Sequence, residues 1–200
     1  MKNHIKICME CVKLSNEKHQ GFEKKAQIMD QQAMARAIVR ISHEIIEKNK
    51  GADGLLLIGV RRRGYPLAHR IAEQIKSIEG VSVPVEGLDI GFYRDDISRN
   101  SEPVITRDEI TASLDGATIV LVDDVICTGR TVRAAIDAIF SHGRPKAVQL
   151  AVLVDRGLRE LPLRPDYVGK NIPTSHSERV YVSTTELDGE DGVIIAAKKP

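Results

Sequence analysis

Two short segments of this sequence are apolar along almost their whole length, and each leads through a polar loop into a helical pattern. They span residues 55–60 and 118–122. A strand with no polar face is buried on both sides, which is typical of a parallel sheet covered by helices. Because parallel strands are joined by right-handed crossovers, the pattern predicts an α/β fold with one mostly parallel, twisted sheet flanked by helices.

The segments around these strands show helical periodicity. From Met34 to Ile45 apolar residues recur at helical spacing, with Asp30 as the expected N-cap and Gly51 as the expected stop. We also expect helices over 65–78 and 132–141, strands over 81–85, 147–154, 180–182 and 193–197, and an acidic turn over 186–191. Residues 89–116 lack this periodicity, and a loop of that length in a compact domain is usually functional or disordered.

The first 25 residues differ from the rest in composition. They are polar and carry six lysines against three glutamates. A pair of cysteines with two nearby histidines could suggest zinc, but a structural zinc site needs four ligands and no second cysteine pair follows. We therefore expect residues 1–25 to form a poorly ordered extension and residues 26–200 to form one domain.

Charge, apolar content and motifs exclude several classes of protein. The 29 basic residues nearly balance the 28 acidic ones, which argues against a nucleic-acid binder that depends on bulk positive charge. No apolar run approaches the roughly 20 residues that cross a bilayer. Three cysteines do not form a disulfide framework, so we expect a cytoplasmic protein. No P-loop or dinucleotide-binding glycine motif occurs, which argues against those nucleotide-binding enzymes.

The second apolar strand is followed by two adjacent carboxylates, Asp123 and Asp124. Neighbouring carboxylates at a strand end can accept hydrogen bonds from two adjacent hydroxyls, such as those of a ribose. Thr128, Gly129 and Thr131 then open a helix, whose first N–H groups and positive dipole end suit a phosphate dianion. The combination predicts a site for a sugar phosphate. The alternative is that the acids only cap the helix, while the threonines and the glycine make the turn.

Residues 120–131, VLVDDVICTGRT, resemble the phosphoribosyl-diphosphate signature of the type I phosphoribosyltransferases. Further segments resemble one branch of that family, the bacterial regulators of pyrimidine operon attenuation that are also uracil phosphoribosyltransferases. These segments are residues 58–64, 92–96, 143–145, 150–156 and 167–175. The resemblance covers about residues 27–195. It implies a single phosphoribosyltransferase domain with a small hood and a flexible active-site loop.

This resemblance implies a reaction in which uracil and phosphoribosyl diphosphate give UMP and diphosphate. Mg²⁺ is the implied cofactor, held mainly by the substrate diphosphate and water. Asp123 and Asp124 are implied to hold the ribose hydroxyls, while Arg62 and Arg63 meet the diphosphate and Arg94 closes over it as a lid. The implied catalytic residues are Arg63, Arg94, Asp123 and Asp124.

The remaining substrate contacts follow from the same resemblance. The 5′-phosphate is implied to lie in the loop of Val125, Ile126, Cys127, Thr128, Gly129, Arg130 and Thr131. Arg156 and the backbone near Val180 are implied to surround the nucleobase. Arg62 and Cys127 depart from the family pattern, in which a small residue such as Thr and an aromatic residue stand at these positions. The alternatives are a solvated loop arginine at Arg94 and a structural ion pair at Arg156.

The resemblance also implies UMP-promoted binding of the pyrimidine operon leader mRNA, on the basic concave face of a homodimer or larger homo-oligomer. The candidate RNA contacts are Arg40, His43, Lys48, Arg159, Arg164 and Lys170. Basic groups gathered in this way can neutralise phosphates whatever the net charge of the chain. Aromatic residues, which stack on RNA bases, make up only 4% of the chain, so a solvated helix face with charged turns is the alternative interpretation.

Three functions therefore stand side by side. The first is an RNA-binding regulator with uracil phosphoribosyltransferase activity. The second is a uracil-salvage enzyme with no role on RNA. The third is a purine-type phosphoribosyltransferase, because the diphosphate signature is shared across the family.

Overall fold

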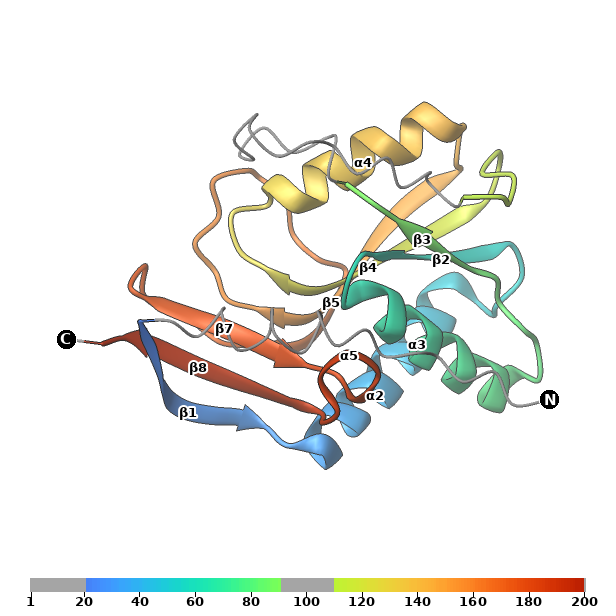
Figure 1. Ribbon diagram of the computed structural model, residues 1–200. Helices are drawn as coiled ribbons and strands as arrows, with labels where there is room; N and C mark the ends of the chain where they lie inside the picture. The colour runs from blue at the N-terminus through green and yellow to red at the C-terminus, as the bar shows by residue number, and fades with distance from the viewer. Residues whose placement is uncertain (1–20, 91–109, 200) are drawn as a thin grey trace.

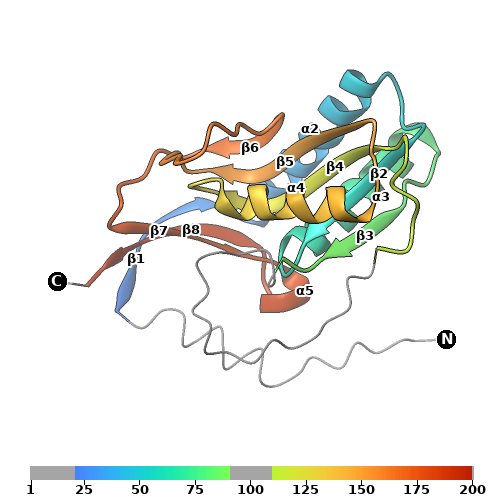
Figure 2. The same cartoon turned by 90° about the horizontal axis from the view of Figure 1, so that it is seen from above.

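The computed structural model describes residues 21–90 and 110–199, which form two sheets with helices packed around the larger one. The larger sheet has five parallel strands in the order β3-β2-β4-β5-β6, and the smaller has three antiparallel strands in the order β1-β8-β7. Figures 1 and 2 show the smaller sheet to one side of the larger. In chain order the elements are β1 (Phe22–Met29), α2 (Gln31–Asn49), β2 (Leu55–Val60), α3 (Gly64–Glu79), β3 (Val85–Leu88), β4 (Thr118–Ile126), α4 (Arg130–His142), β5 (Ala147–Asp155), β6 (Tyr167–Asn171), β7 (Glu178–Ser183), α5 (Thr185–Asp188) and β8 (Gly192–Lys198).

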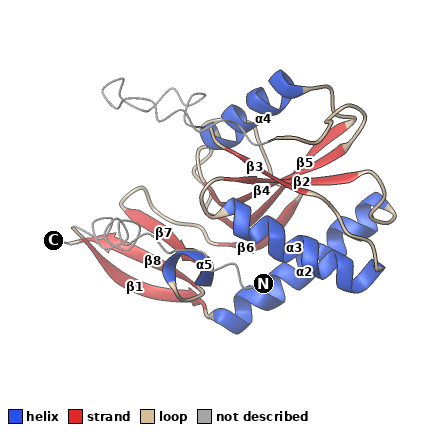
Figure 3. Ribbon diagram, turned by 45° about the vertical axis from the view of Figure 1, so that its right-hand side comes forward, coloured by secondary structure: helices blue, strands red, loops and turns tan. Residues whose placement is uncertain are grey.

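Alternate side chains of each central strand enter two separate cores. In β2, Leu55 and Leu57 pack with residues of α2 and α3, whereas Leu56 and Ile58 pack with residues of α4. Figure 3 shows α2 and α3 on one face of the larger sheet and α4 on the other. A strand with this arrangement has no solvent-facing side, which is why 55–60 carries no polar residue. The expected α/β class with a mostly parallel sheet is therefore confirmed.

The helix ends follow local sequence signals. Asp30 caps α2, its Oδ1 accepting a hydrogen bond from the backbone N of Ala33 at 2.7 Å. The helix ends at Asn49, and Lys50 adopts the left-handed conformation that was expected at the neighbouring Gly51. In the two described stretches of the chain, we find no helix with the length and apolar content needed to span a membrane.

The strand predicted at 81–85 is wrong in position, because β3 begins only at Val85. Pro84 precedes it and has no N–H to donate to a neighbouring strand, although its carbonyl accepts a hydrogen bond from Leu57. Pairing with β2 then runs from Val85 to Leu88. The alternating valines before Pro84 therefore predicted that a strand exists here, but placed it about four residues too early.

Strand β1 crosses the boundary expected at residue 25. It pairs antiparallel with β8, from Phe22 opposite Lys198 to Met29 opposite Val193. Most of its residues are exposed or half-buried, so its composition resembles that of a solvated segment. Residues 22–25 thus belong to the folded domain, and the rest of the expected extension, 1–20, lies outside the described residues.

Candidate active site

The carboxyl ends of β2, β4 and β5 meet at one edge of the larger sheet, because the three strands are parallel neighbours. Strand β4 pairs with β5 as far as Ile126, opposite Asp155. The strand is therefore longer than predicted, and Asp123 and Asp124 lie inside it rather than after it. Backbone pairing continues through the two acids to Val125 and Ile126 because it does not require apolar side chains.

The two carboxylates are held by their own backbone. Asp123 Oδ1 accepts a hydrogen bond from the N–H of Asp124, and Asp124 Oδ1 accepts one from the N–H of Val125, both at 2.9 Å. Asp123 is only 6% exposed. Burial raises the pKa of the Asp124 carboxyl, and the positive charge of Arg63 acts against this rise. The pair is thus a fixed set of oxygen acceptors, with Asp123 buried, Asp124 half-buried and the positive charge of Arg63 acting on it.

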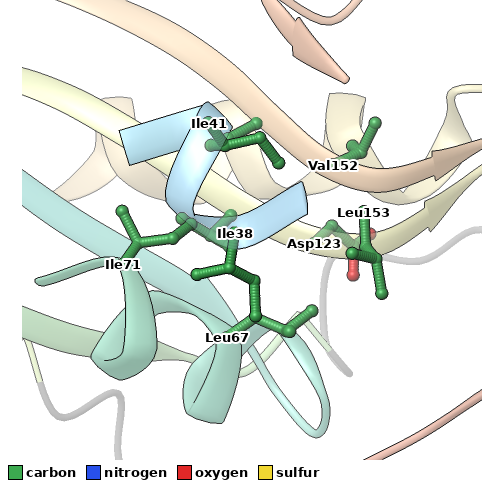
Figure 4. Close-up of a pocket in the computed structure, with 9 residues that line it drawn as sticks. Ile38, Ile41, Leu67, Ile71, Asp123, Val152 and Leu153 are labelled. Atoms are coloured by element: carbon green, nitrogen blue, oxygen red, sulfur yellow. The ribbon is translucent and has the colours of Figure 1, made fainter. Parts of the chain in front are cut away.

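Asp123 also borders a small apolar cavity between α2, α3 and the sheet (Figure 4). The cavity has a volume of about 10 Å³, roughly the space of one water molecule. Its other lining residues are Ile38, Ile41, Leu67, Ile71, Val122, Ala151, Val152 and Leu153. Asp123 therefore lies between the hydrocarbon core and the strand edge, which limits its conformational freedom.

The loop after β2 lies close to this pair. Gly64, the first residue of α3, sits so close to the sheet that a Cβ there would lie 2.3 Å from the carbonyl oxygen of Val122. The preceding residue, Arg63, donates two hydrogen bonds to Asp188 of α5, while Arg62 is exposed and the Arg61–Arg62 peptide bond is cis. The structure thus brings Arg63, but not the Arg62 side chain, into the interior of the site.

The loop that leads into α4 has the features of a phosphate site. Gly129 takes the N-cap position with a φ of 93°, a conformation that other residues rarely adopt. The Thr128 side chain accepts a hydrogen bond from the N–H of Arg130 at 3.3 Å, and Cys127 is half-buried. The loop opens a 13-residue helix, whose N-terminus favours an anion. Val125 and Ile126 end β4 before this loop, and Thr131 lies in the first turn of α4 after it.

Arg159 supports the phosphate loop from the neighbouring connection. Its Nη1 donates to the carbonyl oxygen of Cys127 at 2.8 Å, and its Nη2 donates to Asp155 Oδ2 at 2.6 Å. Thr128 O also accepts from the N–H groups of Glu160 and Leu161. The guanidinium expected at the RNA surface therefore also holds the loop of Cys127 and Thr128 in place from within the protein.

The two residues expected at the nucleobase come from different elements. Arg156, at the end of β5, donates to Thr174 Oγ1 at 3.0 Å and to the carbonyl oxygen of Glu178 at 2.8 Å. It thus ties the large sheet to the segment that enters β7. Val180 of β7 is half-buried and packs against the core on the α2–α3 side. Arg94, the expected lid residue, lies outside the described residues.

Three basic residues of the expected RNA surface meet where α2 packs on β6. Arg40 donates to the carbonyl oxygens of Val168 and Gly169 at 3.1 and 2.6 Å, Lys48 pairs with Asp166, and Lys170 reaches the carbonyl oxygen of Ile28 at 3.4 Å. His43 lies on the exposed side of the same helix. We call Arg40, His43, Lys48 and Lys170 the α2–β6 face. Arg164 is exposed in the segment that leads into β6, and Arg159 lies apart from this face.

The acidic turn at 186–191 contains contacts that the sequence did not indicate. Asp188 binds Arg63, and Arg70 of α3 binds both Glu186 and Asp191. These partners are more than 100 residues apart. The sequence shows only a run of acids near the C-terminus, with no pattern that assigns them to particular arginines.

The donor set fits a magnesium ion that arrives with a phosphorylated substrate. Within residues 21–90 and 110–199, no three His, Cys, Asp or Glu side chains are grouped to hold a metal on their own. Asp123 and Asp124 are nevertheless hard oxygen donors of the kind that Mg²⁺ prefers. Magnesium is commonly bound by one or two carboxylates together with substrate phosphates, which is the arrangement available at this edge.

Known proteins share both this fold and much of this sequence. The structure superposes on the hypoxanthine phosphoribosyltransferase of Trypanosoma cruzi with a TM-score of 0.65, covering 88% of this chain and 98% of that one at 19% identity. A hypoxanthine-guanine phosphoribosyltransferase from Bacillus anthracis also gives 0.65, covering 88% and 99% at 18% identity. At these identities, the match concerns the fold alone.

The sequence matches are much closer. The chain is 63% identical to the Bifunctional protein PyrR of Acetivibrio thermocellus over 173 residues, which is 86% of this chain and 94% of that protein. It is 57% identical to the Bifunctional protein PyrR of Clostridioides difficile over 172 residues, covering 86% and 97%. Residues 24–185 match the model of the phosphoribosyl transferase domain. The chain with Asp123, Asp124 and the Gly129 turn at its sheet edge therefore belongs to the phosphoribosyl transferase domain family.

Proposed function

We propose that this chain transfers the phosphoribosyl group of phosphoribosyl diphosphate to uracil, and that it regulates a pyrimidine operon by binding the leader mRNA when UMP is bound. The enzymatic part rests on one observation: Arg63 directly precedes Gly64, which packs against the backbone of Val122 and Asp123 where β4 leads towards the Gly129 turn. One sheet edge thus offers a carboxylate pair for hydroxyls, a helix start for phosphate and a guanidinium for diphosphate. The identity with proteins named Bifunctional protein PyrR supports the addition of a second, regulatory role.

The residues of this edge have separable roles in the reaction. Asp123 and Asp124 accept hydrogen bonds from the ribose hydroxyls, while the N–H groups of 128–131 hold the 5′-phosphate. N1 of uracil attacks C1′ and loses its proton, and the bond from C1′ to the diphosphate oxygen breaks with its electron pair on the diphosphate. Arg63 stabilises the negative charge that grows there, and Arg94 is the proposed lid. Mg²⁺, when bound, would supply Lewis-acid neutralisation of the diphosphate; it would be held mainly by the diphosphate and water, with Asp123 and Asp124 as the protein oxygens available to it at this edge.

Uracil is favoured over a purine base by sequence identity. The chain shares 63% of its aligned residues with a Bifunctional protein PyrR but only 19% with a hypoxanthine phosphoribosyltransferase of the same fold. The sugar-phosphate site is common to both and does not discriminate between the bases. Base choice must therefore be tested directly with both substrates.

The enzymatic proposal is tested by incubating the protein with phosphoribosyl diphosphate, Mg²⁺ and radiolabelled uracil or hypoxanthine. We expect labelled UMP from uracil and no product from hypoxanthine. The Asp124→Asn variant should lose the activity, whereas Asp53→Asn, the same change at an exposed turn before β2, should retain it. Turnover of hypoxanthine alone would refute the assignment to uracil, and an active Asp124→Asn variant would refute the role of the acid pair.

The proposed RNA site is the α2–β6 face, in an assembly of two or more chains. The Arg40 guanidinium donates to two carbonyl oxygens of β6 and, at 2.8 Å, to the Glu44 carboxylate. These contacts hold it in a fixed position on the face. His43 is exposed and adds an imidazole N–H that can donate a hydrogen bond to a phosphate. A face of this kind contacts phosphates rather than bases, because it offers charge and few planar surfaces.

RNA binding is tested by gel shift of the pyrimidine operon leader with and without UMP, at several salt concentrations. We expect His43→Ala and Lys170→Ala each to weaken RNA binding. For Lys170→Ala, the slope of the logarithm of the binding constant against the logarithm of salt concentration should also decrease by about one. Arg133→Ala is the matched control, because Arg133 lies on α4, on the opposite face of the sheet. No binding at low salt would refute the regulatory role, and an equal loss in Arg133→Ala would refute the location. Sedimentation of the same samples measures the proposed homodimer or larger assembly.

A further inference from the structure

Asp188 of α5, the short helix that joins β7 and β8, makes a two-point contact with the arginine assigned to the diphosphate. Arg63 Nη2 donates to Asp188 Oδ1 at 2.7 Å, and Arg63 Nε donates to Asp188 Oδ2 at 3.2 Å. The two side chains are 19% and 12% exposed, respectively. A paired contact of this geometry fixes the plane of the guanidinium as well as its position, which a single hydrogen bond does not.

Asp188 is itself fixed by the short helix α5. Its Oδ2 accepts a hydrogen bond from the N–H of Thr184 at 2.9 Å, and its own N–H donates to the carbonyl oxygen of Thr184 at 2.7 Å. The carboxylate therefore cannot follow Arg63 if the arginine moves. The orientation of the Arg63 guanidinium is therefore tied to α5 as well as to the loop that carries it.

The remaining edge of the guanidinium belongs to the site. Asp188 occupies the Nε and Nη2 side, and the positive charge of Arg63 also acts on the carboxyl of Asp124. Arg63 thus pairs with Asp188 and immediately precedes Gly64, where a Cβ would lie 3.3 Å from the Cα of Asp123, one of the acids assigned to the ribose hydroxyls. In phosphoribosyl diphosphate the diphosphate is attached to C1′, next to the carbon that carries the 2′-hydroxyl, so a guanidinium in this place is well positioned to meet it.

The contact is not needed merely to attach the acidic turn to the core. Arg70 of α3 already does this, with hydrogen bonds of 2.7 and 2.8 Å to Glu186 and of 2.8 and 2.9 Å to Asp191. The Arg63–Asp188 pair is thus a second link at the same turn, and it differs from the first in reaching the loop after β2. Because the Arg63–Asp188 pair reaches the loop after β2, we infer a role for it in the site rather than only in attaching the turn.

We propose that Asp188 is a positioning residue for phosphoribosyl transfer, which holds Arg63 so that the free edge of its guanidinium receives the diphosphate. The proposal rests on the proposed function, because it takes phosphoribosyl diphosphate as the ligand. It makes α5, which joins β7 and β8 of the smaller sheet, part of the diphosphate site. Asn at position 188 keeps the shape but replaces one acceptor oxygen by an N–H group and removes the charge that holds Arg63.

The test compares Asp188→Asn with Glu186→Gln, which weakens the Arg70 link of the same turn. For each variant, calorimetry with Mg²⁺ measures the Kd for phosphoribosyl diphosphate, steady-state kinetics measures KM for both substrates, and a thermal melt verifies folding. We expect Asp188→Asn to raise the Kd and KM for phosphoribosyl diphosphate about tenfold, the effect of one lost charge-assisted hydrogen bond, and to leave the KM for uracil unchanged. Glu186→Gln should leave all three constants unchanged.

Two kinds of failure can be told apart in this design. An unchanged or lower Kd in Asp188→Asn, or an equal rise in Glu186→Gln, would overturn the positioning role. A wild-type protein that binds phosphoribosyl diphosphate but makes no UMP from uracil would overturn the proposed function instead. In that case the calorimetric comparison of the two variants still decides the role of Asp188.

Discussion

Replacing Gly64 by alanine tests whether the close approach of α3 to β4 positions the site. A Cβ at residue 64 would lie 2.3 Å from the carbonyl oxygen of Val122 and 3.3 Å from the Cα of Asp123. Both neighbours are backbone atoms, so neither can rotate away as a side chain could. Since Cβ contacts below 3.0 Å essentially do not occur, the start of α3 and the sheet must separate by at least about 0.7 Å.

The size of the effect follows from this displacement. Overpacking of a well-packed interior typically costs about 1–3 kcal/mol of the free energy of unfolding. For a domain of this length each kcal/mol lowers the Tm by about 2–4 °C, so a cost of about 2 kcal/mol predicts a decrease of about 4–8 °C. Arg63 directly precedes Gly64 and moves with it, away from Asp124 and Asp188. Displacement of a catalytic group by about 1 Å can cost about a hundredfold in rate, so we expect kcat/KM to fall by about tenfold to a hundredfold.

The assay is a thermal melt followed by circular dichroism, together with the kinetics of UMP formation. Gly192→Ala in β8 is the matched control, because the nearest atom to its added Cβ is the carbonyl oxygen of Met29 at 3.5 Å, an ordinary contact. We expect the control to change the free energy of unfolding by no more than about 0.5 kcal/mol. A Gly64→Ala variant as stable and active as the Gly192→Ala variant would refute the reasoning.

Three further predictions concern single side chains. Asp124→Asn should abolish UMP formation yet raise the Tm at pH 7. Burial raises the pKa of Asp124, so its ionised form destabilises the fold, and the Tm gain of the variant over wild type should vanish below that pKa. A variant Tm at pH 7 equal to or lower than that of wild type would contradict this. Asp30→Ala removes the cap on Ala33 and should cost about 1 kcal/mol in a urea titration with activity intact, whereas no loss would mean that the cap contributes nothing. Burial raises the pKa of Tyr167 to about 12, so the folded state favours the neutral phenol, and stability should fall as the pH rises from 10 to 12. Tyr167→Phe should not show this fall in stability when urea midpoints are measured from pH 10 to 12. An identical fall in both proteins would mean that other groups cause it.

Local pattern predicted the elements that carry the site. Strand β2 was predicted at its observed bounds, and α3 and α4 within two residues, because burial on both faces and helical spacing are properties of neighbouring residues. Asp123, Asp124 and Gly129 were identified for the same reason, since the acids and the turn follow one another directly. The end of β4 was misplaced because its pairing with β5 continues through the polar residues.

The sequence by itself determined the α/β class and the family, and it predicted a sugar-phosphate loop, since all three depend on residues that are close together in the chain. Only the tertiary structure decided that β1 pairs with β8, that Arg159 supports the phosphate loop and that Arg63 meets Asp188. The physical reason is that an ion pair or a strand pairing between distant segments leaves no local periodicity. An arginine that forms an ion pair and one that stays solvated cannot be told apart in the sequence, because the carboxylate partner comes from a distant segment.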